Sequence, residues 1–278
     1  MSTQISIFKS KEKETAYMAA YDEAMKLWPV PYETTYISTS FGETYVNVSG
    51  SEDGEPVILL SGNTDCSVSW YANVEALGAH HRLYAVDVID DVGKSKVSAI
   101  PETREEAADW LREVCEGLEL EKPHLVGLSF GGLHAINFTY YYPDHVGKLV
   151  MLSPAGTIGG VSDRFLLQVI PLAIFPFRRG VAGFLRWLVV NPEVLDNAHG
   201  ELLILAMSVL APIKKVAPFL FTDEELKSIK NRTLLKVGDH DVTYKNRFQA
   251  IVSAKRLMPE LQVGIVPECG HFVAQEQP

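Results

Sequence analysis

Ser129 lies in a sequence context that could make its hydroxyl a nucleophile. An apolar, strand-like run, residues 124–128, leads into the motif Gly-x-Ser-x-Gly, and helix-like residues 133–141 follow it. The motif glycines, Gly127 and Gly131, permit a turn too tight for side chains at those two positions. Such a turn exposes the serine hydroxyl beside a helix start, where developing negative charge is favoured. The pattern therefore predicts covalent catalysis by Ser129.

Two further segments supply the partners that a nucleophilic serine needs, because the bare motif also occurs by chance. Strand-like residues 233–238 end in the Asp-His-Asp run of Asp239–Asp241, and strand-like residues 262–266 are followed by His271. Each candidate thus follows a strand, where the loops at the carboxyl edge of a parallel sheet collect active-site residues. We expect His271 to act as general base toward Ser129, and one of the two aspartates to orient its imidazole.

Two backbone N–H groups are candidates for stabilising the oxyanion that such an attack would create. One is on Phe130, directly after Ser129, and the other lies in the loop that follows strand-like residues 57–60. This loop reads Ser-Gly-Asn-Thr, and we assign the second donor to Asn63. Loss of one such donor typically costs about 3 kcal/mol of transition-state stabilisation. Asn63 and Phe130 are therefore the predicted oxyanion hole.

Each candidate also has a purely structural explanation. The acids could be loop residues or a helix N-cap, and His271 could be a surface histidine. His134 follows Ser129 on the same helix and is expected to pack rather than react, while His240 is expected to be solvated. Cys269 is close to His271 in the sequence, and we expect it to be a bystander. The functional interpretation is preferred because all three candidates occur in a consistent order and on consistent elements.

The segments around these candidates alternate between strand-like and helix-like patterns. Helical residues 11–27 are followed by a hairpin pattern over 36–48 and by strand-like runs at 57–60, 82–87 and 148–152. Thr103 and Glu106 form a capping box before an apolar repeat at helical spacing. Alternation of this kind predicts an α/β protein with a mostly parallel sheet and helices on both faces.

The alternation stops over residues 156–222, which are apolar and helix-like. Because this stretch lies between two core strands, we interpret it as a helical cap, or lid, inserted into a core formed by residues 1–155 and 223–278. Apolar side chains recur along it: Phe165, Leu166, Leu167, Ile170, Phe175, Phe184, Leu185, Trp187 and Leu188. We expect the inner face of the cap to form an apolar pocket for a substrate. Thr222 and Glu225, a second capping box, mark the return to the core.

Five stretches spread over nearly the whole chain carry a family resemblance. They are Leu27–Val30, Tyr36–Gly42, the motif around Ser129, Phe221–Leu226, and Gly270-His271 with Glu276–Pro278. Together they resemble the bacterial α/β-hydrolase carboxylesterases that hydrolyse arylpropionate esters such as naproxen esters, in which the triad order is serine, acid, histidine. The resemblance implies ester hydrolysis without a cofactor or a metal. It also favours Asp241 over Asp239, since family members place this acid third after the glycine.

The chain departs from that family at two places. Many members have His-Gly where this chain has Ser61-Gly62, and that histidine helps to hold the oxyanion loop. Members also continue beyond the Glu-Gln-Pro of residues 276–278 with a helix that covers one face of the sheet. Either this chain is a truncated product, or something else covers that face, for which homodimer contact is one candidate. A less stable protein with a poorly anchored His271 loop is a further alternative.

Composition limits the classes of function. With 278 residues, of which 47% are hydrophobic and 22% charged, the chain can bury the core of an ordinary globular enzyme. The formal net charge of −10 argues against nucleic acid and weakly against anionic membranes, and no apolar run is long enough to span a bilayer. Three cysteines without metal or disulfide spacing, and an N-terminus without a signal-peptide pattern, favour a cytoplasmic protein.

The residues together predict a carboxylic-ester hydrolase that acts on small apolar esters through an acyl-enzyme. The serine argues against haloalkane dehalogenases and epoxide hydrolases, which have aspartate at this position. Thioesterases, lactonases, carbon–carbon bond hydrolases and aminopeptidases use the same triad, so they stay open as alternatives. A non-catalytic ligand-binding protein on the same fold is another, favoured by Ser61 in place of the family histidine.

Overall fold

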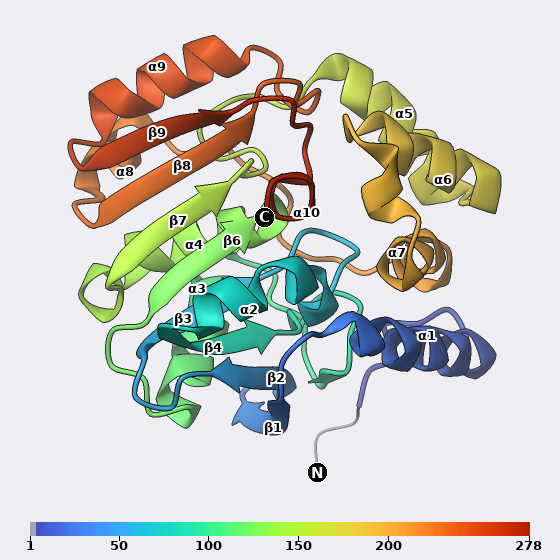
Figure 1. The fold of residues 1–278 in the computed structure, drawn as a ribbon. Helices are drawn as coiled ribbons and strands as arrows, with labels where there is room; N and C mark the ends of the chain where they lie inside the picture. Colours follow the sequence, from blue (N-terminus) through green and yellow to red (C-terminus); the bar gives the residue numbers. More distant parts are fainter. Residues whose placement is uncertain (1–3) are drawn as a thin grey trace.

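One mixed sheet forms the centre of the protein, whose computed structural model describes residues 4–278 (Figure 1). The strand order is β1-β2-β4-β3-β6-β7-β8-β9, with the short β5 paired to β2. β1 and β2 are antiparallel to their neighbours, and all pairs from β4 to β9 are parallel. The strands are β1 (Tyr32–Thr39), β2 (Gly42–Gly50), β3 (Glu55–Leu60), β4 (His81–Val86), β5 (Lys96–Val97), β6 (His124–Leu128), β7 (Lys148–Leu152), β8 (Arg232–Gly238) and β9 (Leu261–Val266). The predicted mostly parallel sheet is confirmed.

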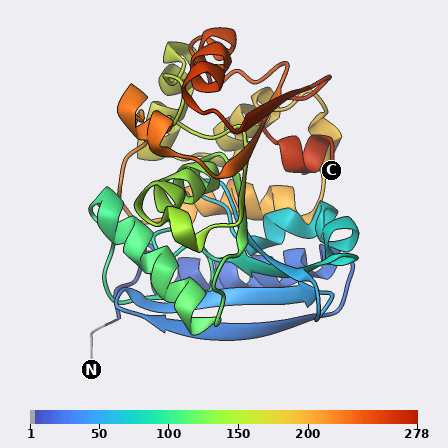
Figure 2. The ribbon, with the colours of Figure 1, turned by 90° about the vertical axis from the view of Figure 1, so that its left-hand side faces the viewer.

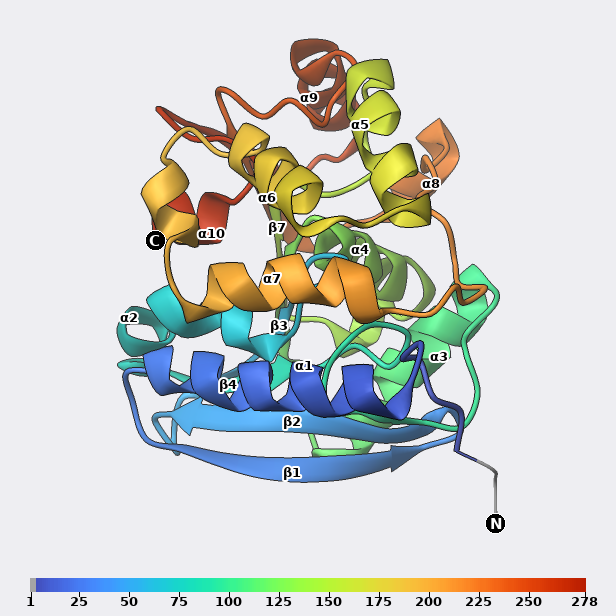
Figure 3. The same ribbon diagram turned by 90° about the vertical axis from the view of Figure 1, so that its right-hand side faces the viewer.

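Helices cover both faces of this sheet, as predicted. Figure 3 shows α2 and α10 on one side of the sheet and α3, α4 and α8 on the other, and Figure 2 shows α3 and α4 side by side in front of the strands. The helices outside the cap region are α1 (Lys11–Ala24), α2 (Val74–Gly78), α3 (Arg104–Gly117), α4 (Phe130–Tyr141), α8 (Asp223–Ser228), α9 (Arg247–Leu257) and α10 (Val273–Glu276).

Local sequence accounts for the elements that position the site. Thr103 and Glu106 make the expected reciprocal capping box of α3, which buries Trp110 and Leu111 against the sheet. The central strand β3 is apolar from Val57 to Leu60 and is buried on both faces, as a strand flanked by helices must be. Each leucine-sized side chain buried in this way contributes about 2 kcal/mol. The carboxyl ends of β3, β6, β8 and β9 are thereby fixed relative to one another.

Residues 156–222, between β7 and α8, form three α-helices that lie beyond the carboxyl ends of the parallel strands (Figure 1). They are α5 (Asp163–Ile174), α6 (Arg178–Trp187) and α7 (Ala198–Val209). Asn191 caps a short 3-10 turn, Pro192–Leu195, so the Asn-Pro pair starts an element. Residues 210–222 return to α8 without forming a helix, so the helical part of the expected cap ends at Val209.

Candidate active site

Ser129 stands at the turn between β6 and α4 in a backbone conformation that the two motif glycines make possible. Its φ is 52° and its ψ is −113°, a strained conformation for a residue with a side chain. A Cβ added to Gly127 would lie 2.2 Å from the Gly131 carbonyl oxygen, and one added to Gly131 would lie 2.1 Å from the Leu60 carbonyl oxygen. Only glycine fits at both positions, and the turn presents Ser129 at the start of α4.

Ser129, His271 and Asp241 come together in one hydrogen-bonded chain, although they lie on three different loops. His271 Nε2 is 2.9 Å from Ser129 Oγ, and His271 Nδ1 is 3.0 Å from Asp241 Oδ2. The other Asp241 oxygen accepts hydrogen bonds from the backbone N–H and the hydroxyl of Thr243. Burial by itself would raise the pKa of the Asp241 carboxyl, but the charge of His271 and the hydrogen bonds from His271 and Thr243 lower it to about 2. Asp241 is therefore held as a carboxylate against the imidazole.

The other aspartate of the run, Asp239, faces away from His271. It is hydrogen-bonded to His240 Nδ1 at 2.7 Å and accepts the Cys269 backbone N–H. His240 is mostly exposed, as expected, and Cys269 is buried. Of the two aspartates, Asp241 is the one that is hydrogen-bonded to His271.

The loop that carries His271 is anchored by the end of α6 and by Glu276. The His271 backbone N–H donates to the Leu188 carbonyl at 2.7 Å. The Glu276 carboxylate accepts N–H groups from Gly270, on the His271 loop, and from Val190, beyond α6. Sequence reasoning noted the Glu-Gln-Pro of residues 276–278 but missed this role, because Val190 lies 86 residues away in the chain. The described residues therefore anchor this loop at two points.

Asn63 and Phe130, the predicted oxyanion donors, lie on either side of Ser129. Phe130 is the first residue of α4, so its N–H has no acceptor inside the helix. Gly62 approaches Ser129 so closely that a Cβ on it would lie 3.5 Å from the serine Cβ. Asn63 follows directly, and within residues 4–278 its backbone N–H makes no hydrogen bond. Both N–H groups are thus available beside the serine.

The loop of Asn63 is held by residues that sequence reasoning did not single out. The Thr64 backbone N–H donates to both carboxylate oxygens of Asp91, at 3.1 and 3.0 Å. Asp65 Oδ1 is hydrogen-bonded to His199 Nε2 of α7 at 3.0 Å. Ser61 is buried, and its hydroxyl has no hydrogen-bond partner among the described residues. The support that a family histidine gives elsewhere therefore comes here from side chains distant in sequence.

An apolar cavity of about 410 Å³ opens directly beside Ser129. The α5 side chains Phe165, Leu166 and Val169 form one wall. The rest of the lining is Asn63, Ser129, Phe130, Pro154, Ala155, Gly156, Gly159, Gly160, Val161, Lys215, Val216, Ala217, Pro218, Thr243, Tyr244 and His271. A smaller cavity of about 100 Å³ also borders Ser129 and His271, under α6 and α7. A bulky apolar group and a small one could thus be placed around one scissile bond.

Not all of the apolar side chains expected inside the cap face this cavity. Phe184, Leu185 and Leu188 are buried. Leu167 and Phe175 are each 76% exposed, and Ile170 is 52% exposed, on the outer side of α5 and just beyond it. The inward-facing expectation is wrong for these three, because α5 packs on one side only and its i and i+3 positions on the other side meet no described element.

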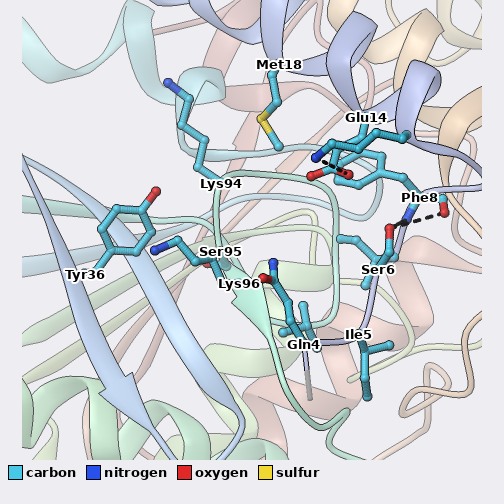
Figure 4. A pocket seen from close by; sticks show the side chains of 13 residues that line it. Gln4, Ile5, Ser6, Phe8, Glu14, Met18, Tyr36, Lys94, Ser95 and Lys96 are labelled. Atoms are coloured by element: carbon cyan, nitrogen blue, oxygen red, sulfur yellow. Dashed lines mark hydrogen bonds and ion pairs between the residues drawn. The ribbon is translucent and has the colours of Figure 1, made fainter. Parts of the chain in front are cut away.

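Another cavity, of about 610 Å³, shares no lining residue with the one at Ser129 (Figure 4). It lies between the N-terminal arm, α1 and the edge strands, and three lysines and Tyr36 line it. Each of these lysines faces a carboxylate, in the pairs Lys11–Glu14 (3.2 Å), Lys94–Asp22 (2.6 Å) and Lys96–Glu43 (2.8 Å). No histidine lines it, so this larger cavity lacks the serine–histidine pair of the candidate active site.

The remaining candidate residues, His134 and the three cysteines, are buried. His134 is buried on α4, where it packs edge-on against the rings of Phe130 and Trp110, and burial lowers its pKa. Cys66, Cys115 and Cys269 are separate buried thiols. Residues 4–278 contain no cluster of three or more His, Cys, Asp or Glu side chains arranged to hold a metal ion. No helix in that range combines the length and the apolar character needed to cross a membrane.

Comparison with known proteins places the chain in a family. Residues 55–278 match the family model of the alpha/beta hydrolase fold. Carboxylesterase YbfK of Bacillus subtilis (strain 168) is 35% identical over 277 residues, which cover 98% of this chain and 92% of that protein. The crystal structure of naproxen esterase (carboxylesterase NP) from Bacillus subtilis aligns with a TM-score of 0.91 at 34% identity, covering 97% of this chain and 95% of that one. The 2-hydroxy-6-oxo-6-phenylhexa-2,4-dienoate hydrolase of Burkholderia cepacia is 27% identical, with 83% and 86% covered.

The chain therefore belongs to the α/β-hydrolase family, and within that family it is similar to bacterial carboxylesterases. The predicted fold, the resemblance and the assignment to hydrolytic enzymes are confirmed. The catalytic roles of individual residues are a separate question.

Proposed function

We propose that this protein hydrolyses small apolar carboxylic esters through a covalent acyl-enzyme, with Ser129 as nucleophile. The observation that carries the proposal is the continuous hydrogen-bonded chain from Ser129 through His271 to Asp241, beside an apolar cavity. His271 Nε2 accepts the Ser129 proton as Oγ bonds to the carbonyl carbon of the ester. The positive imidazolium that results is stabilised by the Asp241 carboxylate.

The tetrahedral intermediate carries a negative oxygen, which the Asn63 and Phe130 N–H groups stabilise. His271 then donates its proton to the oxygen of the leaving alcohol as the bond between that oxygen and the former carbonyl carbon breaks. The acyl group stays on Ser129 until water, deprotonated by His271, attacks the ester carbonyl and releases the acid. This cycle uses only protein groups and water.

The substrate that fits best is an ester with one bulky apolar group and one small group. The cavity of about 410 Å³ would take the bulky group, and the cavity of about 100 Å³ would take the small one. An arylalkanoate methyl or ethyl ester has this shape, and one similar protein is named a naproxen esterase. Residues 156–222 act in this proposal as a lid, since α5 supplies one wall of the larger cavity.

The proposal is tested by hydrolysis of p-nitrophenyl esters of increasing acyl length, followed by methyl esters of aryl-substituted acids. We expect turnover by the wild type and a loss of kcat on the order of 10⁵-fold or more for Ser129→Ala. Ser61→Ala is the matched control, because it removes a buried serine hydroxyl without a partner from the neighbouring loop.

A folded wild type that turns over none of these esters would contradict the proposal. A fluorophosphonate probe then separates two explanations. Labelling of Ser129 would indicate another serine hydrolase, such as a thioesterase, lactonase or carbon–carbon bond hydrolase, and absence of labelling would indicate a ligand-binding protein.

A further inference from the structure

One buried carboxylate joins the oxyanion loop, the loop after β4 and the segment that returns from α7. Asp91, which is 2% exposed, accepts the Thr64 backbone N–H with both oxygens and the Val92 N–H at 2.8 Å. The Lys215 ammonium completes the set, with its Nζ 2.8 Å from Asp91 Oδ2. These four contacts come from three chain segments, so Asp91 fixes the position of each segment relative to the others.

The contact with Thr64 holds a conformation that this residue does not adopt readily. Thr64 has a φ of 58°, in the left-handed region that β-branched residues avoid. In this conformation its N–H points to Asp91, and its hydroxyl donates to the Asn63 carbonyl at 2.7 Å. The peptide that links Asn63 to Thr64 is thereby fixed from both sides. Gly62, the residue before Asn63, lies beside Ser129, so the loop is next to the nucleophile on its other side.

Lys215 extends the same network to the second oxyanion residue and to the cavity wall. Its Nζ lies 4.9 Å from the centre of the Phe130 ring and also donates to the Asp90 carbonyl. Burial by itself would lower the pKa of Lys215, but the carboxylates of Asp91 and Asp90 raise it, so the ammonium stays charged. Lys215 and the residues that follow it, Val216 to Pro218, line the cavity at Ser129. The charged pair thus lies directly behind the predicted oxyanion hole.

We infer that Asp91 is a positioning residue for ester hydrolysis: through the Thr64 N–H it holds the Asn63 N–H in the direction that the oxyanion requires. Lys215 pairs with Asp91, with its Nζ 2.8 Å from Asp91 Oδ2, and ties the segment returning from the cap to the same point. The inference rests on the proposed function. It also explains how the loop stays ordered with Ser61 where many relatives carry histidine. Asp91 touches neither Ser129 nor the cavity, so it acts on the reaction only through the loop.

The neighbouring residue provides a matched control. Asp90 is also a buried aspartate, 1% exposed, but its carboxylate makes no hydrogen bond within residues 4–278. Two titratable groups face it: His134, with its Nε2 3.9 Å from Asp90 Oδ1, and Lys215, which donates to the Asp90 backbone carbonyl. Asp90→Asn therefore makes the same chemical change one residue away, without touching the Thr64 N–H.

The experiment compares kcat and KM for a p-nitrophenyl ester in four proteins: wild type, Asp90→Asn, Lys215→Met, and the double variant Asp91→Ala/Lys215→Met. The double variant removes both members of the pair, so it leaves no unpaired buried charge that could prevent folding. We expect kcat of the double variant to fall by about 10² to 10³, as for the loss of one oxyanion donor. Lys215→Met keeps the contact of Asp91 with Thr64 but removes its countercharge, so we expect a smaller loss of kcat than in the double variant, together with a changed KM because Lys215 lines the cavity. Asp90→Asn should match wild type.

A second measurement distinguishes positioning from general destabilisation. A trifluoromethyl ketone forms a tetrahedral adduct on the serine and uses the oxyanion donors, so its affinity should fall in the double variant by the same factor as kcat. Fluorophosphonate labelling and the far-ultraviolet circular dichroism spectrum report whether Ser129 and the fold are intact.

Three results would overturn the inference. One is a folded double variant with the kcat and the ketone affinity of wild type. Another is an equal loss of kcat in Lys215→Met and in the double variant, which would assign the effect to the charge pair instead of the Thr64 contact. The third is a wild type without esterase activity, which would overturn the proposed function as well and is recognised by the first assay alone.

Discussion

Two turns border Ser129, and they are held in shape by different means. The turn from β6 to α4 is fixed locally, because Gly127 and Gly131 allow a backbone approach that any Cβ would block. The turn after β3, which carries Asn63, has no such local device. It contains a β-branched residue at positive φ and depends on Asp91, 27 residues further along the chain. One turn can be recognised in the sequence by its pattern, whereas the other is specified only by a long-range contact.

The difference has a physical basis. Steric exclusion acts between atoms a few bonds or one turn apart, so it leaves a fixed spacing of glycines in the sequence. A hydrogen bond to a buried carboxylate requires only that the carboxylate lies close to the donor, and a residue on any of several loops could satisfy this. We expect the positions that are essential to the chemistry to be held both by steric exclusion around glycines and by long-range hydrogen bonds.

The largest effect is expected at another long-range contact, that between Asp241 and His271. Asp241→Asn should keep the packing but favour the wrong imidazole tautomer, so kcat should fall by about 10⁴ at neutral pH. Asp239→Asn is the matched control, because Asp239 contacts His240 and the Cys269 N–H instead of His271. A similar loss in both variants in steady-state assays would contradict the assignment of the acid.

The local device should be sensitive to a single methyl group. In Gly131→Ala, the new Cβ would meet the carbonyl oxygens of Leu60 and Ser61 at 2.1 and 2.5 Å. Since both belong to backbone that cannot move freely, we expect unfolding free energy to fall by about 3 kcal/mol. Gly183→Ala on α6, where a Cβ would meet nothing within 4 Å, should instead stabilise the protein by up to about 1 kcal/mol. Urea denaturation of both variants measures this contrast.

Lowering the pH should weaken the contact between Asp241 and His271, whereas the turn at Gly127 and Gly131 contains no titratable group of this kind. The pKa of Asp241 is lowered to about 2 in the folded protein, against about 4 in an unfolded chain. Its contribution, about 2 kcal/mol, is therefore fully present above pH 4 and is lost as the pH falls toward 2. The stability difference between wild type and Asp241→Asn, measured by urea unfolding, should shrink over this range. A difference that stays constant from pH 5 to pH 3 would show that Asp241 is not held as described.

The smallest effect on catalysis is expected from substitutions on α5, whose two faces differ: one lines the cavity and the other is exposed. Val169→Phe narrows the cavity at Ser129, so the preferred acyl chain should shorten and KM for long esters should rise by about tenfold. Leu167→Ala changes the same helix on its exposed side and should leave the chain-length profile unaltered. Identical profiles for Val169→Phe and wild type would indicate that substrates bind elsewhere.

Much of the core could be predicted because its signals are local and repeated. The apolar run of β3, the capping boxes of α3 and α8, and the glycines around Ser129 each limit a short segment to few conformations. The expectation that the three candidate residues lie close together then followed from the rule that parallel strands end at one edge. The sequence offered two neighbouring aspartates, Asp239 and Asp241, as partners of His271. The spacing in the family favoured Asp241, and Asp241 is the one that contacts His271.

The cap shows where such prediction stops. Apolar side chains along α5 and α6 were expected to face inward, but periodicity alone could not say which side of α5 would meet the cavity. Leu166 and Val169 line it, while Leu167 and Ile170 face outward on the same helix. A single helix that packs on one side has an inside and an outside only once its neighbours are in place.

Local sterics and periodicity encode the strand-turn-helix around Ser129 and the alternating core. These features, and the chemical types of the three candidate residues, can therefore be read from the sequence. The tertiary structure alone decided the support of those residues: Asp91 behind the oxyanion loop, Glu276 behind His271, and Thr243 beside Asp241. Asp91 acts across 27 residues of sequence and Glu276 joins segments 86 residues apart, whereas Thr243 lies two residues from Asp241. Their identity depends on where folding brings each loop, which no local pattern records.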